Sequence, residues 1–419
     1  MTERTHSPQA LAQVAARKPA QIPAQDPVQV QLRSPGLAVS LLLALACGVL
    51  AADIYYAQPL VGLIAASLGL PAPLAGLVVT LTQLGYGLGL ILVVPLADIF
   101  ETRRLVLTLV GLSILALVAT ALAPTAGAFL AAAFCTGLGA VAVQVLVPYA
   151  AHLADEASRG RAVGNVMAGL MLGIMLARPL SSFLAGLAGW QGVFLLAAAA
   201  LVPLGLVLRL KLPERRPAGR MGYGALMRSI LSIAATTPVL QRRALYQAAM
   251  FGVFSLFWTV TPLLLASPAI GLGQGGIAIF ALVGAASVLA SPIAGRIADR
   301  GWGRPATRLA LLGGMASFAL CLVLPEAPRP AIALLIVAAL LLDFAVTTNL
   351  VLGQREIFLL EAAIRARLNG IYMATFFLGG ALGSALGVWA YAAGGWHMAA
   401  LLGLAAPTLA FLFALSERR

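Results

Sequence analysis

Apolar residues fill almost the whole chain, and this property restricts the folds open to it more than any other. Of the 419 residues, 61% are hydrophobic and 10% are charged, and the mean hydropathy is +0.98. A helix needs about 20 apolar residues to cross a hydrocarbon layer of about 30 Å. Twelve such runs can be placed, at residues 37–66, 74–97, 105–123, 127–152, 162–188, 191–209, 244–266, 275–298, 306–324, 330–354, 367–392 and 395–415. The sequence therefore predicts an all-α integral membrane protein with twelve transmembrane helices.

The positions of the basic residues predict how these helices are oriented. The net charge of +13 would suit a nucleic-acid-binding protein, but the charges are not clustered as such a partner requires. In the twelve-span arrangement Arg329 lies in a loop on one side, Arg178 lies within a span, and all other Lys and Arg lie on the opposite side. By the positive-inside rule that opposite side is cytoplasmic. We expect a multi-pass protein of a bacterial cytoplasmic (inner) membrane, with both termini cytoplasmic, the lipid bilayer around it and no nucleic acid bound.

An internal repeat divides the chain into two halves. Asp155, Arg161, Gly164, Gly173 and Trp190 recur in the same order and spacing as Glu361, Arg367, Gly370, Gly379 and Trp396. An even number of spans in each half gives both halves the same orientation, as in parallel repeats about an axis along the membrane normal. We expect a disordered cytoplasmic tail at 1–34, a six-helix bundle at 35–209, a basic cytoplasmic loop at 210–242 and a second six-helix bundle at 243–416.

A charged motif occurs once in each half, between the second and third spans. The first copy reads VPLADIFETRR and the second reads GRIADRGWGRP. Two copies at matching positions resemble the cytoplasmic motif of the major facilitator superfamily, although Val94 and Glu101 stand where that family usually has glycine. The resemblance implies the fold of two parallel six-helix repeats. It also implies a charge latch that closes the cytoplasmic side, formed by Asp98, Arg103, Arg104, Gly295, Asp299, Arg300 and Arg304; the alternative is ordinary solubility at helix ends.

The fifth span, GLMLGIMLARPLSSFLAG, is rich in small residues before a proline. It resembles the corresponding span of proton-driven exporters in the same superfamily, except that Arg178 stands where glycine is usual. Small residues four apart let two helices approach closely, and we expect such ridges where the two halves meet. The ridge residues are Gly169, Gly173 and Ala177 followed by Pro179 in the fifth span, and Gly379, Gly383 and Gly387 in the eleventh.

Three ionisable residues, Asp53, Arg178 and Asp343, lie deep inside apolar runs. A charge at the bilayer centre costs about 2.5–3.5 kcal/mol on insertion scales, so such residues usually serve a pathway or binding site. Helical spacing and the family resemblance place further polar and aromatic side chains beside them. The expected coupling and cavity residues are Asp53, Tyr56, Gln83, Gln144, Arg178, Trp258, Asp343 and Thr347. Alternatively, an aspartate pairs with Arg178 for structural reasons, the glutamines form interhelical hydrogen bonds and the aromatic residues only pack.

These features favour a secondary active transporter of a small solute that works by alternating access. We expect proton-coupled efflux, or antiport, of a small amphipathic compound by a monomeric protein. No Walker lysine motif is present, so the proton gradient is the expected energy source, with no cofactor and no metal site. One alternative is uptake or exchange of a small organic anion bound by Arg178, and a remote one is a non-transporting membrane sensor. An enzyme is not expected, because the sequence contains neither HExxH nor GxSxG.

Overall fold

The computed structural model describes residues 37–155, 158–216, 221–300, 302–361 and 364–417. The expected tail at residues 1–34 therefore lies outside the described residues. In the first half the helices are α2 (Leu37–Ala52), η1 (Gln58–Leu60), α3 (Val61–Ser67), η2 (Ala72–Leu74), α4 (Leu77–Leu92), η3 (Val94–Asp98), α5 (Thr102–Ala121), α6 (Ala126–Ala140), α7 (Ala142–Leu153) and α8 (Arg159–Lys211). They are followed by α9 (Tyr223–Thr236), α10 (Pro238–Ala266), α11 (Gln274–Ala281), η4 (Leu282–Leu289), α12 (Ala290–Asp299), α13 (Gly303–Leu322), α14 (Pro328–Phe358) and α15 (Arg365–Leu415).

The described helices account for the twelve expected spans. Nine of them are long and apolar enough to cross a membrane, and two shorter apolar helices, Ala38–Ala52 and Gln58–Ser67, follow one another in the first span. Two of the nine, α8 and α15, are each two spans joined by a tight turn. The turns lie at Gly189 (φ 70°) and Gly395 (φ 66°), a left-handed conformation that glycine adopts without steric cost. The all-α fold with twelve transmembrane helices is confirmed.

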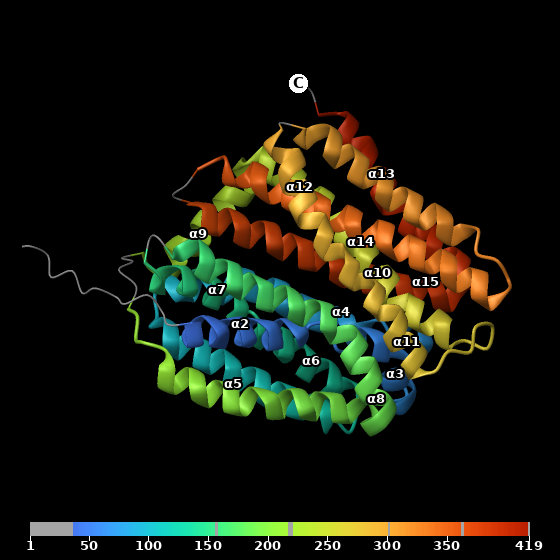
Figure 1. The fold of residues 1–419 in the computed structure, drawn as a ribbon, viewed down its shortest axis with the longest axis horizontal. Helices are drawn as coiled ribbons and strands as arrows, with labels where there is room; N and C mark the ends of the chain where they lie inside the picture. Colours follow the sequence, from blue (N-terminus) through green and yellow to red (C-terminus); the bar gives the residue numbers. More distant parts are fainter. Residues whose placement is uncertain (1–36, 156–157, 217–220, 301, 362–363, 418–419) are drawn as a thin grey trace, which may run out of the picture.

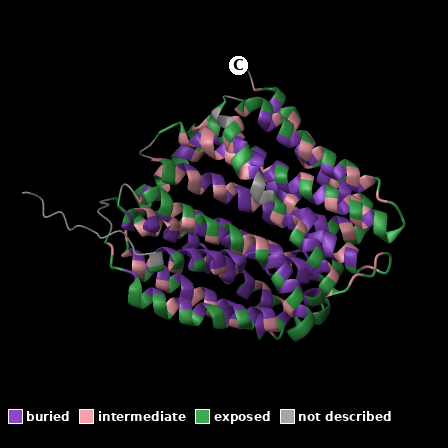
Figure 2. Cartoon of the chain, in the orientation of Figure 1, coloured by how far each residue is buried: buried purple, intermediate pink, exposed green. Residues whose placement is uncertain are grey.

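The two halves form two layers of helices that lie side by side (Figure 1). The helices α2 to α8 build one layer and α10 to α15 build the other, while α4 packs along α15 and α8 packs on α11 across the boundary. Apolar side chains cover the outside: Leu115, Leu187 and Ile279 are each more than 70% exposed. Exposed residues lie on the outer faces and buried ones between the helices (Figure 2). This pattern suits a protein whose solvent is lipid.

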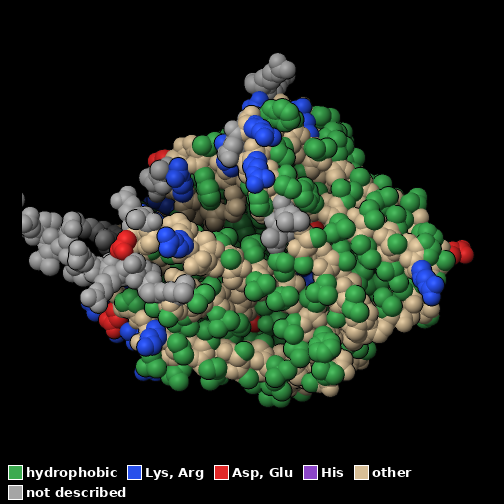
Figure 3. Space-filling model, viewed as in Figure 1, with side chains coloured by type: hydrophobic (Ala, Val, Ile, Leu, Met, Phe, Trp, Pro, Cys, Tyr) green, Lys and Arg blue, Asp and Glu red, His purple; other side chains and the backbone are tan. Residues whose placement is uncertain are grey.

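Basic side chains gather toward one end of the molecule (Figure 3). We call it the arginine-rich end, which is where α5, α8, α10 and α13 begin. The amphipathic helix α9 lies here, between the two halves. Its Tyr223 hydroxyl donates to the carbonyl of Leu92 in the first half at 3.0 Å, and its Ser229 hydrogen-bonds Arg367 in the second half. The segment that connects the halves is thus partly helical and contacts both of them.

Glycine ridges bring helices of the same half into backbone contact. A Cβ atom placed on Gly173 in α8 would lie 2.0 Å from the carbonyl oxygen of Gly48 in α2. A Cβ atom on Gly383 in α15 would lie 1.8 Å from the carbonyl oxygen of Gly252 in α10. The two contacts are equivalent in the two repeats. We expected these ridges at the boundary between the halves; their closest contacts instead join helices within each half, because the partner helices also present glycine there.

The other five residues predicted with these ridges are also packed against neighbouring parts of the chain. Gly169 and Gly379 would meet the carbonyl oxygens of Ala44 and Ala248, each at 2.3 Å, and Gly387 would meet the side chain of Leu256 at 2.5 Å. Ala177 and Pro179 are buried inside α8. Such close approach gains dispersion contact that larger residues would prevent.

Candidate functional site

The first transmembrane span is interrupted near its middle. The helix α2 ends at Ala52, and α3 does not begin until Val61. Pro59 cannot donate a backbone hydrogen bond, and the carbonyl of Tyr55 accepts from the N–H of Gln58 at 3.2 Å instead. Irregular backbone at membrane depth is tolerated only where protein or a cavity surrounds it. The break therefore indicates a site with a role beyond crossing the membrane.

Asp53 lies in this break. It is 2% exposed, and neither of its carboxylate oxygens has a hydrogen-bond partner within the described part of the chain. Tyr56, predicted to share its face, is also buried. A buried carboxylate without a partner is expensive, so Asp53 is better tolerated as a neutral acid in this conformation.

Arg178 projects from α8 into a cage of aromatic rings. Its Nε donates to the Oε1 atom of Gln58 at 2.6 Å. Its guanidinium carbon lies 4.9 Å from the ring centre of Tyr55, 5.0 Å from that of Phe254 and 4.8 Å from that of Trp258. Each desolvated cation–π contact is worth up to about 2 kcal/mol. The cage explains how a guanidinium that is 4% exposed is accommodated.

Asp343 from α14 completes the polar centre. Its Oδ1 atom accepts a hydrogen bond from the indole Nε1 of Trp258 at 2.9 Å. Among the described residues no Arg178 nitrogen lies within 4.0 Å of a carboxylate oxygen, but Arg178 and Asp343 both contact Trp258. Trp258 thus stands between the two charges, with its ring toward the guanidinium and its N–H toward the carboxylate. We call Tyr55, Gln58, Arg178, Phe254, Trp258 and Asp343 the central cluster.

The central cluster joins the two halves chemically. Gln58 and Arg178 come from the first half, whereas Trp258 and Asp343 come from the second. Nη2 of Arg178 and Nε2 of Gln58 have no acceptor in the described structure. The cluster therefore brings a cation and a carboxyl group together among buried side chains, and two of its hydrogen-bond donors have no acceptor. An anionic group, or a change in the proton on Asp343, would alter its charge balance directly.

The other predicted cavity residues lie outside this cluster. The amide of Gln83 donates to Ser255 at 3.0 Å and so links α4 to α10 across the boundary. Gln144 donates to the hydroxyl of Tyr86 at 3.0 Å, within the first half. Thr347 is half-buried on α14. These contacts match the interhelical hydrogen bonds that were the alternative for both glutamines.

Sequence reasoning missed three buried amide side chains. Gln58 binds Arg178, and the signal for it was a polar residue directly before Pro59 in an apolar run. Asn349 of α14 donates to the Oε1 atom of Gln247 in α10 at 2.6 Å. The sequence signal for this pair was one polar amide inside each of two apolar spans. Only the tertiary structure shows that the two side chains contact each other.

The first copy of the charged motif wraps around Glu101. Its carboxylate caps α5 by accepting from the backbone N–H groups of Arg103 and Arg104, each at 2.8 Å, and from that of Arg215 at 3.2 Å. Burial raises the pKa of Glu101, but these hydrogen bonds and the Arg104 charge outweigh it and hold the pKa below its usual value. Asp98 is exposed, and within the described residues it forms no ion pair.

The second copy engages the C-terminal segment. Arg304 lies 3.5 Å from Glu417, which also pairs with the buried Arg243 at 3.3 Å. Arg300 is exposed, and Gly295 has open space where a Cβ would lie; Asp299 ends α12. Among the described residues, the ion pairs of Arg104 and Arg304 each stay within one half in this conformation. The expected charge latch therefore remains a prediction.

Comparisons with known proteins place this chain among transporters. A profile described as Major Facilitator Superfamily matches residues 43–357. The chain is 37% identical over 370 residues to the uncharacterized transporter YgaY of Escherichia coli O157:H7, covering 88% of this chain and 92% of that one. The nucleoside transporter NupG has a similar structure, with a TM-score of 0.71 at 14% identity over 90% of this chain and 99% of NupG. The D-xylose–proton symporter has a TM-score of 0.69 at 18% identity over 91% and 98%.

Proposed function

This chain belongs to the major facilitator superfamily and is a membrane transporter, and we propose that it exports a small amphipathic solute in exchange for protons. The proposal rests on the central cluster, in which Arg178 of one half and Asp343 of the other share one buried volume. A transporter that rocks its halves against each other needs a contact between them whose strength depends on what is bound. The central cluster is such a contact.

Protonation of Asp343 supplies the switch in this proposal. While the carboxyl is ionised, its attraction to the charge on Arg178 favours the association of the two halves, and the N–H of Trp258, which belongs to the same half as Asp343, holds the carboxylate in position. A proton on Asp343 removes that attraction and leaves the guanidinium dependent on the aromatic rings and Gln58. The conformation that exposes the cluster to the other compartment then becomes accessible, and solute and proton move in opposite directions.

Asp53 serves as a second proton site. Its oxygens have no partner in the described structure, so the carboxyl gains most from a proton here and least once the break in the first span is exposed to water. Moving one charge through 100 mV provides about 2.3 kcal/mol. At about 1.4 kcal/mol per tenfold ratio, this maintains a solute gradient of roughly fiftyfold. One such carboxyl is therefore enough to drive export.

The orientation follows from the arginine-rich end. Basic residues are retained on the cytoplasmic side of a bacterial inner membrane, so both termini and α9 face the cytoplasm. The solved structure of similar fold titled a D-xylose–proton symporter supports the view that this fold can couple solute to protons. The export direction comes from the small-residue pattern of the fifth span.

Reconstituted protein tests the coupling. Liposomes are loaded with the lipophilic cation ethidium, a pH gradient is imposed, and both ethidium movement and internal pH are followed. Asp53→Asn and Asp343→Asn should each abolish proton movement driven by ethidium, whereas Asp155→Asn, on an exposed loop, should leave it unchanged. Normal proton movement in both variants would remove the coupling role.

Exchange of a small organic anion is the second candidate, favoured by the unpartnered Nη2 of Arg178. A carboxylate could accept hydrogen bonds from this atom and from Gln58 while an aromatic body stacks on Trp258. Saturable uptake of salicylate that is lost in Arg178→Gln, together with absent ethidium transport, would favour this candidate over export.

A further inference from the structure

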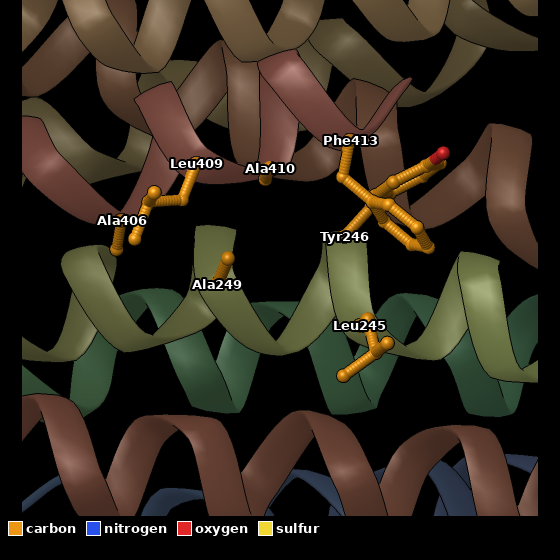
Figure 4. A pocket seen from close by; sticks show the side chains of 7 residues that line it. All are labelled: Leu245, Tyr246, Ala249, Ala406, Leu409, Ala410 and Phe413. Carbon is orange, nitrogen blue, oxygen red and sulfur yellow. The ribbon is translucent and has the colours of Figure 1, made fainter. Parts of the chain in front are cut away.

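An apolar groove runs along the membrane-facing surface between α10 and the last helix of α15 (Figure 4). Its volume is about 270 Å³, and it is lined by Leu245, Tyr246, Ala249, Ala406, Leu409, Ala410 and Phe413. Three alanines contribute to the lining, so two neighbouring helices leave a channel there where larger side chains would have filled it. The groove is separate from the central cluster and has no part in the transport mechanism proposed above.

The groove lies in one leaflet only. Its residues on α10 follow the first residue of that helix, Pro238, by about 10–17 Å at 1.5 Å per residue. A hydrocarbon layer is about 30 Å thick. The groove therefore starts near the arginine-rich end and stops near the middle of the bilayer, which is the space that one acyl chain of that leaflet occupies.

The end of the groove nearest the arginine-rich end carries positive charge. The guanidinium of Arg242 lies 4.6 Å from the ring centre of Phe413, a groove residue. It donates to the Ser416 hydroxyl at 3.3 Å, and in the described structure it has no carboxylate within 4.0 Å. Nearby, Arg243 and Arg304 share the single carboxylate of Glu417. The net charge at this end of the groove is thus positive.

An unsatisfied hydroxyl lies beside this charge. Tyr246 reaches from α10 toward α15 and its ring crosses that of Phe413, with ring centres 5.8 Å apart (Figure 4). The residue is 1% exposed, and its hydroxyl has no hydrogen-bond partner among the described residues. Because this hydroxyl is buried, it does not reach a lipid in the groove, and the ring of Tyr246 contributes to the apolar lining only.

We infer that this groove binds one anionic phospholipid of the leaflet at the arginine-rich end. An acyl chain lies on Ala249, Ala406 and Ala410, and the phosphate lies at Arg242. Basic pockets between transmembrane helices on the cytoplasmic side bind such headgroups. A zwitterionic lipid would fill the groove equally well but would gain less from the arginine.

Native mass spectrometry of the detergent-purified chain tests this. Dioleoyl phosphatidylglycerol and dioleoyl phosphatidylethanolamine, which share their acyl chains, are titrated separately. We expect one phosphatidylglycerol per chain, bound more tightly than phosphatidylethanolamine. Arg242→Gln should weaken it about fivefold, and Ala406→Leu should weaken both lipids by filling the groove. Arg228→Gln, the same loss of charge on the exposed face of α9, should change neither.

Several results would overturn the inference. Equal retention of the two lipids, or equal weakening by Arg242→Gln and Arg228→Gln, would leave only general attraction to a basic surface. Competition by inorganic phosphate would indicate a site for a free anion. A two-chain species lost in Ala406→Leu would show that a second copy covers the groove. Leu409→Ala, at a residue 66% exposed, removes apolar contact from the wall of the groove and should also weaken both lipids, so it serves as the test should Ala406→Leu fail to fold.

Discussion

Substitution of Gly173 by alanine should separate two helices that the fold requires to touch. The added Cβ would lie 2.0 Å from the carbonyl oxygen and 2.5 Å from the carbonyl carbon of Gly48, whereas ordinary contacts lie at 3.4–4 Å. Both contact atoms belong to the backbone, so no side chain can move away and α8 must withdraw from α2 by more than 1 Å. A gap of about 0.5–1 Å already forfeits a quarter to a half of a dispersion contact, so a larger one loses at least about half of each contact along the seam.

The expected loss of stability follows from these distances. Overpacking costs about 1–3 kcal/mol, and alanine recovers up to about 1 kcal/mol through its higher helix propensity. Because both contact atoms belong to the backbone, the cost should lie in the upper part of this range, at about 2–3 kcal/mol, and the unfolding free energy should fall by about 1–2 kcal/mol after the recovery. A bundle of 150–250 residues loses about 2–4 °C of melting temperature per kcal/mol, which predicts a decrease of about 2–8 °C.

Thermal unfolding of detergent-purified protein, followed by tryptophan fluorescence, measures this decrease. Gly383→Ala, the equivalent change in the second half with a contact at 1.8 Å, should cause a similar loss. Gly164→Ala is the control, because it lies in the same helix as Gly173 but has open space around it, and it should melt at or slightly above the wild-type temperature. Gly173→Ala that melts like Gly164→Ala would refute the backbone contact.

Three further polar contacts can be tested by substitution. Trp258→Phe keeps a ring near Arg178 but removes the donor to Asp343, and it should lower the unfolding free energy by about 1–3 kcal/mol; an unchanged melting temperature would contradict the hydrogen bond. Asn349→Leu should lower the unfolding free energy by a similar amount, because the buried Oε1 atom of Gln247 loses its hydrogen-bond donor. Adding Gln247→Leu should restore part of this loss. Glu101→Gln should destabilise by about 1 kcal/mol at neutral pH. Because the pKa of Glu101 is lowered in the folded protein, this difference should be present above the ordinary glutamate pKa and shrink as the pH falls through the folded pKa; a difference independent of pH would contradict the charged cap.

Which charges meet could not be read from the sequence. Asp53 and Asp343 were both candidates to neutralise Arg178, and only the fold shows that Asp343 is linked to Arg178 through Trp258, while Asp53 has no partner among the described residues. Spacing along one helix predicts which residues share a face. It does not determine how helices from different halves are rotated toward each other, so the aromatic cage of Arg178 was not foreseen.

The glycine ridges illustrate the same division. Spacing four apart predicted that Gly169, Gly173, Gly379 and Gly383 would allow close packing, but their partners were placed wrongly, because Gly48 and Gly252 looked like ordinary members of apolar runs. A glycine in an apolar run indicates only that another part of the chain packs closely against it. The identity of the neighbour depends on contacts between residues far apart in the chain.

What the sequence determined by itself was the solvent, the number of spans, the repeat and the orientation expected from its arginines. These properties are additive over local segments, since the transfer of each helix into lipid depends on its own composition and length. The tertiary structure alone decided that Trp258 stands between a guanidinium and a carboxyl group, that Gln58 binds Arg178 and that Arg242 lies above an apolar groove. Those arrangements depend on helix packing, in which a small rotation exchanges one neighbour for another at little change in apolar burial.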